Sequence, residues 1–130
     1  MSNVKKSEDM YMSIVEDINK LKKEKNTVIL AHYYVRPEVQ DVADYIGDSF
    51  YLSKVAANAK EDTIVFCGVS FMGVSAKMRS PEKTVRMQDM SADCPMAHMA
   101  DAETIKKMRA NYDDLAVVCY INSTAELIRY

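Results

Sequence analysis

The sequence lacks the features of a membrane or secreted protein. No apolar run approaches the roughly 18 residues of a membrane-spanning helix, and the opening residues, MSNVKKSEDM, contain no apolar core of a secretory signal. The cysteines, Cys67, Cys94 and Cys119, form no CxxC pair and no disulfide framework. A formal net charge of −2 provides no bulk attraction for nucleic acid. We therefore expect a cytoplasmic chain with reduced cysteines and no membrane or nucleic-acid partner.

Two common nucleotide-binding motifs are also missing, because the sequence contains neither a Walker A loop nor a GxGxxG turn. The composition is that of a globular protein, since 48% of the 130 residues are hydrophobic and 28% are charged. This length fits one domain, or one domain with part of a second.

Short apolar runs alternate with helical stretches along the chain. Met10, Ile14, Ile18 and Leu21 recur at helical spacing and predict a first helix. Continuous apolar runs then predict strands at 27–31, 63–67, 84–87 and 115–120. The stretches between them predict helices at 39–46, 49–59, 71–78 and 102–109. This alternation predicts an α/β fold, a four-stranded parallel sheet with helices on both faces.

Polar residues follow each predicted strand. In a parallel sheet the carboxyl ends of the strands meet at one edge, which is where ligands bind. The residues there include His32, Tyr33 and Tyr34, then 68–70, then 89–94, and finally Tyr120 and Asn122. An imidazole, phenols, hydroxyls, an amide and a thiol together suit a small polyanionic substrate.

Single residues in this set leave alternatives open. Cys94 lies in a loop, whereas the other two cysteines lie inside apolar runs, so Cys94 is either a ligand or an ordinary loop residue. One cysteine cannot hold a metal or a cluster by itself. His32 is either a general base or a histidine that is hydrogen-bonded at a strand end.

Three carboxylates, Asp41, Asp44 and Asp48, recur at spacings of three and four. Those spacings place them along one face of the predicted helix 39–46 and its continuation. They are either a solvated helix face or a cluster for a cation.

Four blocks of the sequence resemble the quinolinate synthase family, in its N-terminal portion. They are AHYY (31–34) with PEVQDVADYIGDS (37–49), VFCGV (65–69) with FM (71–72), PEKTV (81–85) with CPMA (94–97), and YINS (120–123). Their order and spacing make the resemblance specific, and it covers nearly the whole chain from about residue 9.

The resemblance implies an iron–sulfur transferase of NAD biosynthesis. Its members condense iminosuccinate (iminoaspartate) with dihydroxyacetone phosphate to give quinolinate. They have three similar three-layer αβα domains, and a 4Fe–4S cluster is held by three cysteines, one from each domain. By matching positions, Cys94 is the first cluster ligand, and the other two ligands are absent from this chain. The implied substrate contacts are His32, Tyr34, Ser49, Tyr120 and Asn122, of which His32 and Tyr34 are also the implied catalytic residues.

Three residues depart from the family pattern. Asp93 stands where the family usually has glycine, His98 where it usually has an acid, and Val74 where it usually has glutamate. We expect a carboxylate beside an anionic cluster to make that cluster harder to reduce or less stable.

The chain is also expected to be incomplete. Residues 1–112 should form the first αβα domain, and residues 113–130 the first strand and the start of a second. The partner of the chain would then be the remainder of the polypeptide or a complementing chain, and the chain alone would be inactive. The alternatives are a non-catalytic αβα module that binds a small dicarboxylate or a partner, and a regulatory thiol protein that uses Cys94.

Overall fold

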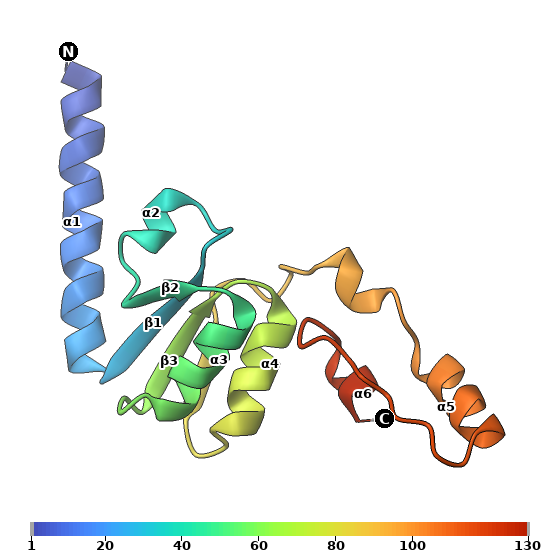
Figure 1. Cartoon of the computed structure of the whole chain (residues 1–130). Helices are drawn as coiled ribbons and strands as arrows, with labels where there is room; N and C mark the ends of the chain where they lie inside the picture. The colour runs from blue at the N-terminus through green and yellow to red at the C-terminus, as the bar shows by residue number, and fades with distance from the viewer. Residues whose placement is uncertain (1, 130) are drawn as a thin grey trace.

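A four-stranded sheet organises the part of the chain that the computed structural model describes, residues 2–129 (Figure 1). Met1 and Tyr130, the outer limits of the two predicted domains, lie outside the described residues. The strands are β1 (Thr27–His32), β2 (Tyr45–Gly47), β3 (Thr63–Cys67) and β4 (Thr84–Met87), and their spatial order is β2-β1-β3-β4. All neighbouring strands are parallel. The predicted α/β fold with a four-stranded parallel sheet is confirmed.

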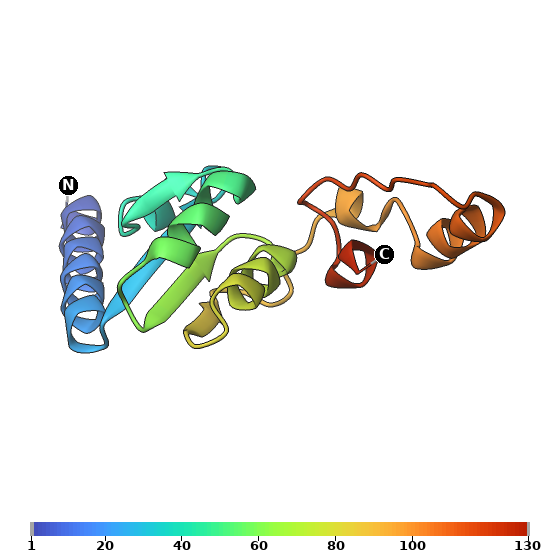
Figure 2. The same ribbon diagram turned by 60° about the horizontal axis from the view of Figure 1, so that its bottom comes forward.

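Helices cover both faces of this sheet (Figures 1 and 2). The helices are α1 (Ser2–Glu24), α2 (Pro37–Gln40), α3 (Ser49–Asn58), α4 (Ser70–Arg79), the 3-10 helix η1 (Pro95–His98), α5 (Ala102–Asn111) and α6 (Ala125–Ile128). Helices α3 and α4 pack on one face and against each other, and α1 and α2 lie against the other face. The result is the expected three-layer αβα arrangement.

Strand β1 lies at the centre of the core because its side chains alternate between the two layers. Val28 and Leu30 join the cluster under α3 and α4, whereas Ile29 and Ala31 join the cluster under α1 and α2. All four are buried. A strand that is covered on both faces has to be apolar at every position, which explains the uninterrupted run that predicted it.

The fourth strand of the sheet is β2, and the predicted helix 39–46 is therefore wrong. Helix α2 ends at Gln40, and the chain re-enters the sheet at Tyr45, which pairs with Leu30. Asp44 makes this change possible. Its backbone N–H donates to Ile29 O at 2.9 Å, and its Oδ2 accepts from Ile29 N–H at 2.8 Å. These two hydrogen bonds fix residue 44 beside β1, so the chain cannot continue as a helix.

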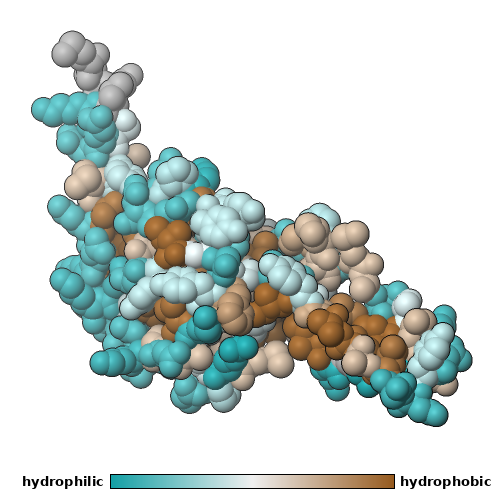
Figure 3. Space-filling view, viewed as in Figure 1, coloured by the Kyte–Doolittle hydropathy of each residue, from teal (hydrophilic) through white to brown (hydrophobic). Residues whose placement is uncertain are grey.

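The prediction of a strand at 115–120 is also wrong, because no ladder forms there in the described structure. We call residues 99–129 the C-terminal arm. Within it, 115–120 runs back from α5 toward α6, in the part of the molecule that projects away from the sheet (Figures 1 and 2). A strand needs a neighbouring strand to pair its backbone groups. In the described structure no further strand pairs with the open edge of β4. Val118 is consequently 95% exposed, and Figure 3 shows hydrophobic surface over the arm.

Helix α1 contacts the sheet through a different face from the one that the apolar spacing picks out. Of the predicted stripe, only Ile18 packs against the core, whereas Met10, Ile14 and Leu21 are exposed. The contact is completed by polar groups. Tyr11 Oη donates to Asp41 Oδ2 at 2.8 Å, and Lys22 Nζ lies 2.7 Å from Asp44 Oδ1. Within the described residues, no helix is both long and apolar enough to cross a membrane.

Candidate active site

A pocket of about 280 Å³ opens at the carboxyl ends of β1 and β3. The chain leaves β1 toward β2 on one side and returns to β3 on the other side of β1, so this crevice is the point at which the strand order reverses. In open parallel sheets that point is the usual ligand site. The lining residues are His32, Tyr34, Val35, Ser49, Gly68, Val69, Phe71, Met72, Gln88, Asp89, Ala92, Cys94 and Asn122.

His32 is the last residue of β1, and its ring is held by local contacts. Its Nδ1 accepts the backbone N–H of Tyr34 at 3.2 Å. In the neutral ring the proton is therefore on Nε2. The Tyr33 and Tyr34 rings pack on the imidazole at centroid distances of 4.5 and 4.8 Å. Burial lowers the pKa of His32, and the charge of Asp48 partly opposes that effect. The ring is thus poised as a neutral imidazole at pH 7.

Ser49 reaches the pocket because α3 begins there. Asp48 caps the helix by accepting Tyr51 N–H at 2.7 Å, and Ser49 is buried as the first helical residue. Helix α4 begins on the other side of the pocket, next to Val69 and Phe71. Two helix N-termini at one pocket favour an anionic ligand.

Gly68 allows the end of β3 to approach β1 closely at the bottom of the pocket. A Cβ at this position would lie 3.2 Å from Met72 Sδ and 3.4 Å from His32 Cβ. A side chain at residue 68 would therefore press first on the flexible end of Met72, while its distance to His32 would be that of an ordinary van der Waals contact.

Cys94 enters the pocket from the loop that follows β4. Ser70 N–H donates to Ala92 O at 2.9 Å, which ties this loop to the start of α4. Cys94 itself is half-buried and packs against the core cluster under α3 and α4. It occupies the N-cap position of η1, without a capping hydrogen bond from its side chain.

The C-terminal arm supplies the remaining wall through Asn122. The Asn122 Oδ1 atom is buried and has no hydrogen-bond partner within the described residues. An acceptor that is removed from water without a partner is costly, unless a ligand supplies the donor. Tyr120 is not among the lining residues, and its side chain is 72% exposed.

Five of the six residues that the sequence picks out thus surround one pocket, from four separate stretches of chain. Their functional roles remain predictions. Sequence reasoning missed Gln88, which also lines the pocket, although it directly follows β4 and so had the same signal as His32.

A family model described as Quinolinate synthetase A protein matches residues 16–128. The chain belongs to this family. Quinolinate synthase of Fusobacterium nucleatum is 63% identical over 113 residues, which are 87% of this chain and 38% of that protein. Quinolinate synthase of Clostridium perfringens is 55% identical over 89% of this chain and 38% of its own length. That of Clostridioides difficile is 53% identical over 91% of this chain and 39% of its own length. The chain therefore spans less than two fifths of the curated relatives that it matches.

The cysteines of this quinolinate synthase family member lie in three different environments. Cys67 is only 4% exposed and belongs to the core cluster under α1 and α2, and burial raises its pKa. Cys119 is exposed in the arm, and its Sγ contacts Ser123 Oγ at 3.1 Å. Among the described residues, Cys94 is the only cysteine that lines the pocket. The described residues contain no group of three metal-ligating side chains, so the chain fits the implied cluster as the donor of one thiolate.

The three carboxylates at helical spacing do not form a cation site. Asp41 accepts from Tyr11, Asp44 from Ile29 and Lys22, and Asp48 from Tyr51. Asp41 therefore connects the end of α2 to α1, and Asp44 connects the start of β2 to β1 and α1, whereas Asp48 caps α3, in which Tyr51 itself lies. The idea of one shared helix face was also wrong, because α2 ends before residue 41.

Two of the three departures from the family pattern contact each other. His98 Nε2 lies 2.8 Å from Asp93 Oδ2, in the loop that carries Cys94. Val74, the third departure, is exposed on α4 and does not line the pocket.

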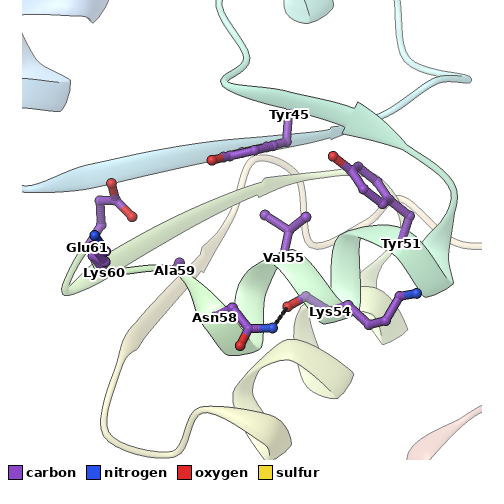
Figure 4. A pocket seen from close by; sticks show the side chains of 8 residues that line it. All are labelled: Tyr45, Tyr51, Lys54, Val55, Asn58, Ala59, Lys60 and Glu61. Atoms are coloured by element: carbon purple, nitrogen blue, oxygen red, sulfur yellow. Dashed lines mark hydrogen bonds between the residues drawn. The ribbon is translucent and has the colours of Figure 1, made fainter.

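A second pocket, of about 520 Å³, lies between α3 and the edge strand β2 (Figure 4). Tyr45 and Tyr51 stand on one side of it, and Lys60 and Glu61 lie beside the start of β3. Asn58, which also lines it, donates back to Lys54 O at 2.8 Å within α3. Much of this pocket borders the amino ends of the strands, away from the strand-order reversal, so it is the weaker candidate.

Proposed function

We propose that this chain forms the N-terminal part of a quinolinate synthase, which condenses iminosuccinate with dihydroxyacetone phosphate to quinolinate in de novo NAD biosynthesis. Its residues 1–112 would be the first αβα domain, and residues 113–130 the beginning of the second. The observation that carries the proposal is the gathering of His32, Ser49, Cys94 and Asn122 around one pocket in a member of this family.

The chemistry of the pocket suits these substrates. Carboxylate and phosphate groups need hydrogen-bond donors, which the Ser49 hydroxyl, the Tyr34 phenol and the His32 Nε2–H provide. The N-termini of α3 and α4 add favourable partial charge. The unpartnered Asn122 Oδ1 offers an acceptor for a substrate hydroxyl or imine N–H.

Proton transfers are assigned to His32 and Tyr34. Tautomerisation of a triose phosphate and formation of a Schiff base both move protons between carbon, oxygen and nitrogen. A lowered pKa keeps His32 able to accept a proton at neutral pH, and the adjacent Tyr34 phenol can return one. Both side chains line the same cavity, so a bound substrate can reach both of them.

Cys94 would hold the 4Fe–4S cluster together with thiolates from outside this chain. When bound, the cluster supplies an open iron that acts as a Lewis acid toward substrate oxygens. Because Cys94 and His32 line the same pocket, this chemistry would take place beside the residues that move protons.

A chimera tests this proposal. In it, this chain replaces the matching 38% of the Fusobacterium nucleatum enzyme. We expect the anaerobically reconstituted chimera to make quinolinate, and Cys94→Ala to abolish both the cluster and the product. Cys119→Ser is the matched control and should retain both. A Cys94→Ala chimera that keeps its cluster would refute the ligand assignment, and a cluster-loaded wild-type chimera that makes no quinolinate would refute the activity.

A second candidate function is a small-dicarboxylate-binding module without catalysis. It is favoured by the two helix N-termini, of α3 and α4, at the pocket. Titration of the cluster-free chain with succinate, followed by NMR, tests it. Saturable chemical-shift changes at Asn122 and Ser49, together with a chimera that makes no quinolinate, would favour this second function over the first.

A further inference from the structure

The loop around Cys94 contains a carboxylate whose two oxygens have separate partners. Asp93 Oδ1 accepts the backbone N–H of Cys94 at 2.8 Å, and Asp93 Oδ2 contacts His98 Nε2 at 2.8 Å. An ionised carboxylate can only accept, so the His98 ring donates. A single side chain thus connects the imidazole to the backbone of the cysteine.

The other backbone group of Cys94 is also held. Cys94 O accepts from Ala97 N–H at 2.9 Å, across the first turn of η1. Ala97 is fully buried in the core under α3 and α4, which fixes the far end of this turn. Asp93 and η1 therefore restrain Cys94 at both its backbone N–H and its carbonyl oxygen.

We propose that Asp93 and His98 are positioning residues that hold Cys94 in the conformation in which its thiol lines the pocket. The consequence for a cluster rests on the proposed function, whereas the restraint of the Cys94 backbone does not. Asp93 supplies the acceptor, and His98 keeps that carboxylate turned toward Cys94 and disperses its negative charge.

The pair is suited to positioning more than to stability. The side chains of His98 and Asp93 are 55% and 52% exposed, and ion pairs of that exposure contribute little to folding. Changes at these positions should therefore alter the Cys94 loop while the core keeps its stability. If the pair had only a structural role, the same changes would lower the stability of the core and leave the Cys94 loop unaltered.

Hydrogen exchange of the Cys94 amide in the cluster-free chain tests the restraint directly. Asp93→Ala removes the acceptor and should speed this exchange about tenfold, the effect of losing one charged hydrogen bond. Asp93→Asn keeps an acceptor oxygen and should restore slow exchange, while His98→Ala should give an intermediate rate. Asp113→Ala, at an exposed carboxylate in the arm, is the matched control and should change nothing. Amides of Leu30 and Phe66 report whether the core stays folded.

Two results would overturn the proposal. One is a Cys94 amide exchange rate that is the same in Asp93→Ala, in His98→Ala and in the unmodified chain. The other is faster exchange at Leu30 and Phe66 to the same degree as at Cys94, because the pair would then support the whole fold.

The reduction potential of the cluster-loaded chimera provides a second readout. His98→Ala should make the potential more negative, since an undispersed carboxylate disfavours an added electron. Asp93→Asn should make it less negative. Potentials that do not move would refute this effect on the cluster. A chimera that never binds a cluster would count against the proposed function and leave the amide exchange result standing.

Discussion

At the residue scale, His32 has the environment that a proton-transferring group needs. Its ring is partly buried against two tyrosine rings that also contact each other, and this desolvation lowers its pKa below the ordinary 6.5. We expect an NMR titration of the chain to show a His32 midpoint below the ordinary 6.5. Asp48→Asn should lower the His32 midpoint further, because it removes the opposing charge and still allows capping of α3. Asp113→Asn should leave it unchanged, and a His32 midpoint at or above 6.5 would contradict the assignment.

The same shift links His32 to stability. Since the pKa is lower in the folded chain, the unfolded chain takes up the proton first as pH falls. The stability contributed by neutral His32 is therefore present above about pH 6.5 and is lost as pH falls through the folded pKa. Urea unfolding across this range should show a flatter pH dependence for His32→Gln than for the unmodified chain. Identical slopes would show that the ring is not desolvated.

Much of the site could be predicted at this scale, for a topological reason. His32 ends β1, and Cys94 lies in the loop after β4, so the rule about carboxyl ends selects both from the apolar runs alone. The contacts between such residues could not be predicted. Asp93 and His98 were identified only as departures from a pattern, and nothing in their spacing shows that they meet.

At the element scale, the sequence-based predictions of secondary structure were wrong where contacts with distant parts of the chain override the local hydrophobic pattern. Residues 39–46 have helical spacing, yet Asp44 joins the edge of β1 through both its backbone and its carboxylate. The 115–120 run has the composition of a strand, but strand formation depends on a partner that no local sequence specifies. Helices α3, α4 and α5 were predictable, because each lies between clear breaks in the sequence.

Asp44 should therefore be a key residue for the α1–β1–β2 corner. Asp44→Ala removes the acceptor of Ile29 N–H and leaves Lys22, whose side chain is 15% exposed, without its carboxylate. We expect a loss of about 1–3 kcal/mol in the free energy of unfolding. Asp44→Asn keeps an acceptor for Ile29 and should lose less. Urea denaturation measures both, and an Asp44→Ala chain as stable as the Asp113→Ala control would refute this role.

The apolar residues of β1 and those of α1 also differ in how much they contribute to the free energy of unfolding. Leu30 in β1 is fully buried between layers, so Leu30→Ala should cost about 2–5 kcal/mol through the cavity that it leaves. Ile14 in α1 is 50% exposed, and Ile14→Ala should change stability by less than about 0.5 kcal/mol. Equal effects in urea denaturation would mean that α1 packs through the face that its spacing indicates.

At the scale of the whole molecule, the site is assembled from two parts. The sheet domain contributes the floor of the pocket through β1, β3 and the loop after β4, and the arm contributes Asn122. Much of the arm's apolar surface remains exposed in the described structure (Figure 3). The chain also spans only 37–39% of the length of the curated relatives that it matches. The pocket is thus lined by the sheet domain on one side and by the arm on the other.

This division predicts what the chain can do alone. Of the cysteines in the part of the chain that the structure describes, Cys94 alone lies at the pocket. Cys67 lies in the core on the other side of the sheet, and Cys119 contacts Ser123 in the arm. The three thiols therefore cannot converge on one cluster without unfolding the sheet domain. We expect anaerobic reconstitution of the chain to leave iron and sulfide far below the amounts of one 4Fe–4S cluster per chain, and to give no quinolinate. The chimera, treated in parallel, serves as the positive control. Four irons and four sulfides bound per isolated chain, or product formed by it, would show that this chain provides a complete site without the rest of its relatives' length.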